Sequence, residues 1–274
     1  MSKHLLIFIT FIFVITANVS AQNLKLIKTK KWLATLGQTY SIDELENLQI
    51  LILRNKSVTD EDLVLVSYIT TLKRLIIISP NVSDTGIAHL RNIRGLTELH
   101  IPNTGITDAG LDYLKAFKTL RLIDLSRTKV TNEGLKKLQP IYTLWVVKLR
   151  YTQITDEGLI NLKPLKNIQK LDLSGSPITD AGLEHIKALY HMQYLFLNNT
   201  PITDAGLNQI ESLAKLYELR VNKTKFTIKG LRKYHQKRGN VRILFKELIG
   251  DKSKSDSKTE ADVKNKVNKT NSKK

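Results

Sequence analysis

A pattern of 24 residues, repeated eight times in succession, constrains this chain more than any other feature of its sequence. The repeats begin at Leu48 and continue to residue 240, without an insertion before the last of them. They open at Leu48, Leu72, Leu96, Leu120, Leu144, Ile168, Met192 and Leu216. Because so short a unit can bury its apolar side chains only against the units on either side, the sequence predicts a solenoid of stacked repeats.

Each repeat contains two different periods of apolar residues. In residues 96–119, Leu99 and Ile101 stand at positions 4 and 6 and alternate as in a short strand, whereas the apolar residues at positions 16, 19 and 22 follow helical spacing. Between them, Thr107 and Asp108 are typical of a helix start, with the threonine as N-cap and the carboxylate near the exposed amides of the first turn. The sequence therefore predicts a strand, a turn and a helix in every repeat.

Glycine recurs at position 15 of the repeat, inside the first helical turn. A glycine there costs about 1 kcal/mol relative to alanine, so its recurrence needs a reason. We expect neighbouring turns to pack too closely at this position for a side chain. The glycines are Gly86, Gly110, Gly134, Gly158, Gly182, Gly206 and Gly230.

The chain resembles the leucine-rich repeat family, whose signature is leucine at positions 1, 4 and 6, a polar residue at 9 and an apolar one near 11. The recurring motif Ile-Thr-Asp-Ala-Gly-Leu is similar to the repeats of the ribonuclease-inhibitor-like and F-box-associated branch, and to those of exported bacterial repeat proteins. The resemblance implies an α/β solenoid, or horseshoe, with a parallel β-sheet on the concave face and helices on the convex face. Position 9 departs from the commonest pattern, because threonine often replaces Asn or Cys; we expect its hydroxyl to bond the backbone of the adjoining turn.

Residues 1–21 have the layout of a secretory signal peptide. Lys3 and His4 precede an apolar run over residues 5–15, and small residues lead to a predicted cut after Ala21. The alternative is a retained membrane anchor, but the apolar run is shorter than the roughly 20 residues that a spanning helix needs. We therefore predict a secreted, periplasmic or cell-envelope protein with no transmembrane span after cleavage.

The repeats are flanked by segments of a different kind. Residues 22–47 predict an N-terminal helical cap, with a first helix around Trp32 and a capping box that opens a second helix at Ser41. This segment is too short for an F-box, so an F-box-type adaptor is the least favoured function. Residues 241–250 predict a C-terminal capping strand, and residues 251–274 a disordered Lys-rich tail.

The chain is strongly basic, with a formal net charge of +18. This balance favours acidic partners, although dispersed lysine is also an ordinary solubilising surface. We expect no specific recognition of nucleic acid. A second hypothesis is an envelope-associated structural protein that its basic tail tethers to an anionic polymer.

Catalysis is not indicated by any pattern in the chain, and we expect no cofactor or metal. The histidines, apart from the one in the leader, are not paired at the spacing of metal ligands. Asp124 and Asp172 belong to alternate repeats with Lys148 between them, so we expect a separation of roughly 10 Å and salt bridges rather than a catalytic pair.

The concave face is the predicted binding site for a protein or a cell-surface glycan. The resemblance implies that positions 2, 3, 5, 7 and 8 face outward there, and aromatic and basic residues gather at these positions in the fifth to eighth repeats, a composition typical of binding hot spots. The alternative is a purely structural role in cross-strand packing and an alternating charge ladder. We expect a monomer that binds its ligand through Trp145, Lys148, Arg150, Lys170, Asp172, Tyr194, Phe196, Tyr217 and Arg220.

Overall fold

The structure is a computed structural model that describes residues 21–245. The predicted signal segment, apart from Ala21, lies outside these residues, as does the predicted Lys-rich tail. Residues 21–35 are helical and are followed by α2 (Ile42–Glu46). Among the described residues, no helix is both long enough and apolar enough to span a membrane.

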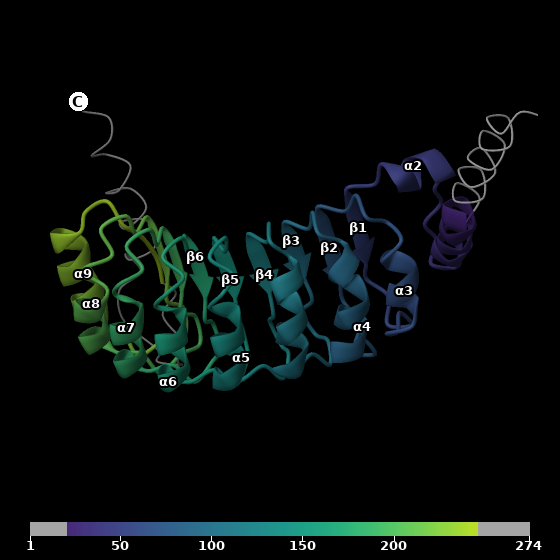
Figure 1. Ribbon diagram of the computed structural model, residues 1–274. Coiled ribbons are helices and arrows are strands. Elements are labelled where there is room, and N and C mark those ends of the chain that lie inside the picture. The colour runs from purple at the N-terminus through teal and green to yellow at the C-terminus, as the bar shows by residue number, and fades with distance from the viewer. Residues whose placement is uncertain (1–20, 246–274) are drawn as a thin grey trace, which may run out of the picture.

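The repeats form one open parallel sheet whose nine described strands follow chain order. Figure 1 shows the strands side by side along the molecule, with the helices on the opposite side of the solenoid. This arrangement confirms the predicted α/β solenoid. The strands are β1 (Ile50–Leu53), β2 (Arg74–Ile77), β3 (Glu98–His100), β4 (Leu122–Asp124), β5 (Val146–Lys148), β6 (Lys170–Asp172), β7 (Tyr194–Phe196), β8 (Glu218–Arg220) and β9 (Arg242–Leu244).

The helical segments of the repeats are short. They are α3 (Asp62–Val66), α4 (Asp84–His89), η1 (Leu90–Asn92), η2 (Ala109–Ala116), α5 (Asn132–Leu138), α6 (Asp156–Leu159), η3 (Ile160–Leu162), α7 (Asp180–Ile186), α8 (Asp204–Gln209) and α9 (Ile228–Lys237), where η marks a 3₁₀ helix. The third repeat thus has a 3₁₀ helix where the sequence predicted an ordinary helix. Strands lie about 4.8 Å apart while α-helices are about 10 Å wide, so the narrower 3₁₀ winding fits the tight spacing of the stack.

The repeat length determines the register of the sheet. Leu99 at position 4 pairs with Leu75 on one side and with Ile123 on the other, each one repeat away. These side chains are fully buried, as are their neighbours at position 6, and they join one continuous core along the solenoid. Each repeat therefore buries its apolar face against the next, as predicted.

The aspartate at position 13 links adjacent repeats. Thr131 Oγ1 donates to Asp108 Oδ2 at 2.6 Å, and its backbone amide donates to Oδ1 of the same carboxylate at 2.8 Å. Asn132 occupies this position in the fourth link; its Oδ1 accepts from the Thr155 amide, and its Nδ2 donates to Thr155 Oγ1. The equivalent pairs are Asp60 with Ser83, Asp84 with Thr107, Asp156 with Thr179, Asp180 with Thr203, and Asp204 with Thr227. The sequence had indicated only helix capping for these carboxylates.

The same carboxylates explain the recurring glycine. A Cβ on Gly110 would collide with Asp84 Oδ1, and a Cβ on Gly182 would collide with Asp156 Oδ1. The predicted close packing at position 15 is thus confirmed, and the neighbour that causes it is the carboxylate that bonds the next repeat.

The threonine hydroxyl at position 9 bonds within its own repeat. Thr104 Oγ1 donates to the Ile101 carbonyl at 2.7 Å, and Thr128, Thr152 and Thr200 bond in the same way. The prediction that this hydroxyl bonds the adjoining turn is therefore wrong for these threonines. The hydroxyl instead satisfies a carbonyl three residues earlier, where the chain turns away from the strand.

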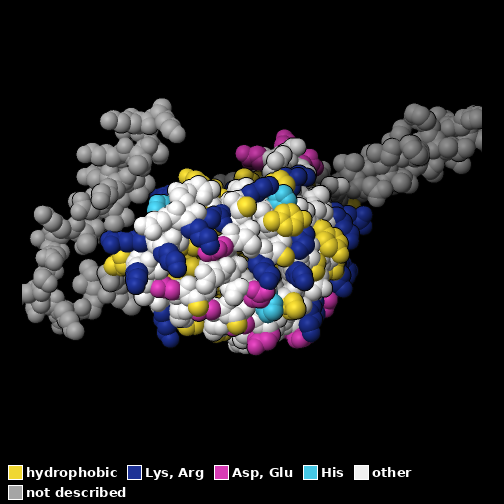
Figure 2. All heavy atoms as spheres, turned by 90° about the vertical axis from the view of Figure 1, so that its left-hand side faces the viewer, with side chains coloured by type: hydrophobic (Ala, Val, Ile, Leu, Met, Phe, Trp, Pro, Cys, Tyr) yellow, Lys and Arg dark blue, Asp and Glu magenta, His cyan; other side chains and the backbone are white. Residues whose placement is uncertain are grey.

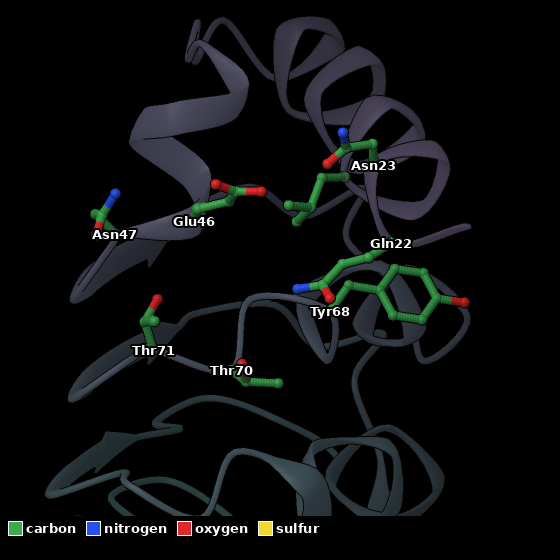
Figure 3. A pocket seen from close by; sticks show the side chains of 8 residues that line it. Gln22, Asn23, Glu46, Asn47, Tyr68, Thr70 and Thr71 are labelled. Carbon is green, nitrogen blue, oxygen red and sulfur yellow. The ribbon is translucent and has the colours of Figure 1, made fainter. Parts of the chain in front are cut away.

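The N-terminal helices cover the open end of the first repeat. Leu26 and Leu33 are buried, and Thr29 Oγ1 donates to the Leu65 carbonyl at 3.0 Å. The predicted capping box is confirmed, since Ser41 Oγ accepts from the Glu44 amide at 3.1 Å. Figure 3 shows a cavity of about 420 Å³ at this junction, lined by residues of the cap and of the first repeat.

Candidate functional site

The side of the sheet opposite the helices, called the concave face below, carries all nine predicted ligand residues. Positions 3 and 5 of each strand point to this face because they alternate with the buried position 4. The structure divides the nine residues into two groups. One group lines a cavity near the carboxyl ends of the strands, and the other forms an aromatic row near their amino ends.

The cavity has a volume of about 490 Å³ and is called the hollow below. Six of the predicted residues line it: Lys148, Arg150, Lys170, Asp172, Phe196 and Arg220. The remaining lining residues were not predicted: Pro102, Asn103, Asp124, Ser126, Arg127 and Asn198. Five cationic side chains and two carboxylates therefore converge on one space.

Both carboxylates of the hollow are buried and paired with cations. Lys148 Nζ lies 3.2 Å from Asp124 Oδ2, and Arg150 Nε lies 3.7 Å from Asp172 Oδ2. The prediction of salt bridges for the two aspartates is therefore confirmed. These contacts use both carboxylates for structure.

The pKa values of the two carboxylates shift in opposite directions. Burial would raise the pKa of Asp124, but hydrogen bonds from His100 and Ser126 and the charge of Lys148 hold that pKa well below its usual range. Burial raises the pKa of Asp172, and its hydrogen bonds from Ser174 offset only part of this. The half of the hollow around Asp124 thus holds a firmly ionised carboxylate.

Phe196 lies on the concave face beneath two cations. Lys170 Nζ is 4.7 Å from the centre of its ring and Arg220 Cζ is 4.2 Å from it, which leaves the residue only 5% exposed. The prediction included Phe196 among the ligand contacts, whereas its ring is a support for the two cations that cover it. Asp172, also buried, is likewise not an open contact.

Lys170 differs from the other predicted cations of the hollow. Lys148, Arg150 and Arg220 each lie in a salt bridge, whereas Lys170 has no carboxylate within ion-pair distance among residues 21–245. Burial and the like charges of Lys148 and Arg220 lower the pKa of Lys170. Its ammonium group thus lies among other cations, and the carboxylates of Asp172 and Glu218 offset only part of their effect.

A charge ladder does extend across most of the concave face, as the structural alternative predicted. Arg74 Nε lies 2.6 Å from Glu98 Oε2, and Arg220 and Arg242 both contact the Glu218 carboxylate. Lys170 falls outside this ladder, so cross-strand pairing does not explain it.

The aromatic row consists of Trp145, Tyr194 and Tyr217. Tyr217 is 52% exposed and meets Tyr194 edge to face, with ring centres 5.9 Å apart. Trp145 is 40% exposed, and the Arg121 guanidinium lies over its ring, with Cζ 4.6 Å from the ring centre. These rings offer exposed apolar area beside the hollow.

Sequence analysis missed a stacked group at position 8, beside the hollow. Arg127 and Tyr151 have φ values of 57° and 52°, in the left-handed region, and Arg127 Cζ lies 4.3 Å from the Tyr151 ring centre. Gly175, at the same position of the next repeat, leaves room for this ring, since a Cβ there would collide with it. Asn103, Asn199 and Lys223 also stand at position 8 with positive φ, so the signal was a bulky residue where Asn or Gly is favoured.

Positive charge by itself does not mark the site. Figure 2, which faces the C-terminal end of the solenoid, shows Lys and Arg side chains spread over this end with Asp and Glu among them. The hollow differs because its cations converge. Within the part of the chain that the structure describes, no three His, Asp or Glu side chains are grouped so as to hold a metal ion.

The fold and the repeats together define a leucine-rich repeat solenoid. Residues 118–138, 143–163 and 165–187 match the family model described as leucine-rich repeat. No curated protein matches the chain significantly.

Among solved structures, internalin C2 from Listeria monocytogenes is 19% identical with a TM-score of 0.59, over 76% of this chain and 88% of that one. Another internalin of the same organism, inlF, is 20% identical with a TM-score of 0.54, over 78% of this chain and 65% of that one. At such low identity these similarities show the fold alone.

Proposed function

We propose that this leucine-rich repeat protein binds a protein or another cell-surface ligand through its concave face and performs no catalysis. One observation carries the proposal: cations converge on a hollow of about 490 Å³ beside exposed aromatic rings on the same face. Tyr, Trp and Arg dominate binding energy at interfaces, because they combine large contact area with hydrogen bonding. The salt bridges of Asp124 and Asp172 support a non-catalytic role.

We also propose that the protein is exported to the cell surface or secreted. This part of the proposal rests on the sequence of residues 1–21, with its basic start, apolar run and small residues before the predicted cut. N-terminal sequencing of the mature protein tests it. A mature chain that begins at Gln22 is the expected result, whereas a retained Met1 would contradict export by this route.

A binding experiment with two matched double variants tests the use of the concave face. Trp145→Ala with Tyr217→Ala removes exposed rings from this face, and Tyr113→Ala with Ile160→Ala removes exposed apolar groups from the helical side. Each immobilised protein is exposed to surface and secreted proteins of the source organism. We expect the first variant to lose the ligand that the wild type and the second variant retain; equal capture by all three would overturn the proposal.

A further inference from the structure

Lys170 makes no ion pair within the described chain. It is half-buried, its Nζ is 4.7 Å from the Phe196 ring centre, and no carboxylate of residues 21–245 lies within ion-pair distance of it. The charges of Lys148 and Arg220 act against its ammonium group more strongly than the carboxylates of Asp172 and Glu218 favour it. Because a partly buried charge is unfavourable without a counterion, this arrangement favours the arrival of an anion.

Ser126 gives a second, independent observation in the same hollow. The residue is 8% exposed, and its Oγ makes no hydrogen bond of good geometry within residues 21–245, although the residue lies beside the Asp124 carboxylate, to which its backbone amide donates at 3.1 Å. At the same position two repeats later, Ser174 Oγ accepts from Asn198 Nδ2 at 3.3 Å. A buried hydroxyl without a partner costs about 1–3 kcal/mol, and an oxygen of a bound anion would accept its hydrogen bond.

The backbone at Arg127 and Tyr151 gives a third observation. The left-handed conformation recurs at position 8 of the repeats and costs roughly 1–2 kcal/mol for residues other than glycine; Arg127 and Tyr151 adopt it with bulky side chains beside the hollow. The result is a guanidinium held flat against a ring, with Arg150 Cζ 5.8 Å from the same ring centre. Backbone strain of this kind is often found at functional sites, and here it positions two guanidinium groups beside the hollow.

The chemistry of the ligand follows from the charged groups that lie over the aromatic rings. Arg121 covers Trp145, Arg127 covers Tyr151, and Lys170 and Arg220 cover Phe196. One face of each of these rings carries a cation, so the surface that the hollow presents to a ligand is mainly charged. The groups left to bind are guanidinium and ammonium, which recognise carboxylates by paired, charge-assisted hydrogen bonds.

We propose that the hollow binds an Asp- and Glu-rich segment of a protein partner, with Lys170 receiving one carboxylate and Ser126, Arg127 and Arg150 receiving another. Ser126 follows β4 and Lys170 lies on β6, two strands away, so they are about 10 Å apart across the sheet and one carboxylate cannot reach both. The segment therefore carries at least two acidic residues. This inference rests on the proposed function and names the class of partner.

Fluorescence anisotropy with a labelled peptide of alternating Glu and Gly tests the inference, with the Gln and Gly counterpart as control peptide. Lys170→Gln removes a cation of the hollow that makes no ion pair in the described chain, and Lys163→Gln removes an exposed cation from the helical side with the same change in net charge. We expect Lys170→Gln to weaken binding of the acidic peptide at least tenfold and Lys163→Gln less than twofold. Equal losses in the two variants, or no binding of the acidic peptide, would overturn the proposal.

Two further arms separate the alternatives. Ser126→Ala should weaken peptide binding severalfold while leaving the unfolding temperature unchanged or higher; unchanged binding would exclude Ser126 from the site. A sulfated polysaccharide that binds through Lys170 when the acidic peptide does not would overturn the choice of a protein partner. If the Trp145 and Tyr217 variant loses its partner but Lys170→Gln keeps it, the proposed function stands and this inference fails.

Discussion

Removal of one of the Asp–Thr links between adjacent repeats should destabilise the protein by a predictable amount. Asp84 accepts from the Thr107 amide at 2.8 Å and from Thr107 Oγ1 at 2.6 Å. Each hydrogen bond to a charged acceptor contributes about 1.5 kcal/mol. We therefore expect Asp84→Ala to lower the free energy of unfolding by about 3 kcal/mol in urea denaturation followed by circular dichroism.

One link between repeats has a neutral residue in place of the aspartate and serves as a control for the effect of charge. Asn132 holds the equivalent position, accepting from the Thr155 amide at 3.0 Å and donating to Thr155 Oγ1 at 2.8 Å. Asp84→Asn should therefore keep both hydrogen bonds and cost about 1 kcal/mol or less, as for hydrogen bonds between neutral groups. Glu61→Ala removes an exposed carboxylate without a side-chain cap and should have little effect.

A double-mutant cycle tests the cause directly. A Cβ on Gly110 would meet Asp84 Oδ1 first, so Gly110→Ala should be strongly destabilising in the wild type and much less so in the Asp84→Ala background. The reasoning would be refuted if the two substitutions were additive, or if Asp84→Ala cost no more than Glu61→Ala.

Substitutions in three other parts of the molecule also have expected outcomes. Asp124→Asn should lower the urea midpoint of unfolding at pH 7, because a carboxylate whose pKa is lower in the folded state than the unfolded value of about 3.9 stabilises the protein above that value. Asp172→Asn should raise the midpoint at pH 7, because the pKa of Asp172 is raised in the folded state and its ionised form destabilises the protein. Both differences should shrink by pH 3 in urea titrations. Gly175→Ala should destabilise more than Gly37→Ala in thermal unfolding, since both have positive φ but only the first would collide with a neighbouring ring. Tyr234→Phe should leave stability unchanged or raise it by about 1 kcal/mol, since the buried hydroxyl has no partner in the described chain, and it should remove a phenol whose pKa burial raises to about 12 in an absorbance titration.

The repeat period was sufficient to predict most of the fold. A spacing of 24 residues with alternating apolar residues at positions 4 and 6 requires one strand per repeat, so the parallel pairing of Leu99 with Leu75 follows directly. The link between Asp108 and Thr131 could not be predicted in the same way. A carboxylate at a helix start is equally favourable when it caps its own helix, and only the stacking of the repeats directs it to the next one.

The site was predictable in position but not in exposure. Trp145 and Phe196 are both aromatic residues at outward-facing positions, yet the first is 40% exposed and the second 5%. The difference arises because long side chains on both neighbouring strands, Lys170 and Arg220, lean over Phe196. Sequence shows which residues share a face, but the direction of a flexible side chain depends on packing around it.

The two sides of the solenoid differ in regularity: the side-chain links on the helical side recur from the first repeat to the eighth, whereas the residues of the hollow do not recur. On the helical side, each described link between adjacent repeats consists of two hydrogen bonds with one side chain, and no side chain of the concave face takes part in it. The residues of the concave face are therefore free to vary without loss of these links, and most of their charged side chains pair across strands. Lys170 stands outside that pairing, and Arg127 and Tyr151 place bulky side chains at position 8, where the backbone is left-handed in several repeats, at Lys223 as well. Lys170, Arg127 and the buried Ser126 hydroxyl line one hollow, and the proposed anionic ligand accounts for the three together.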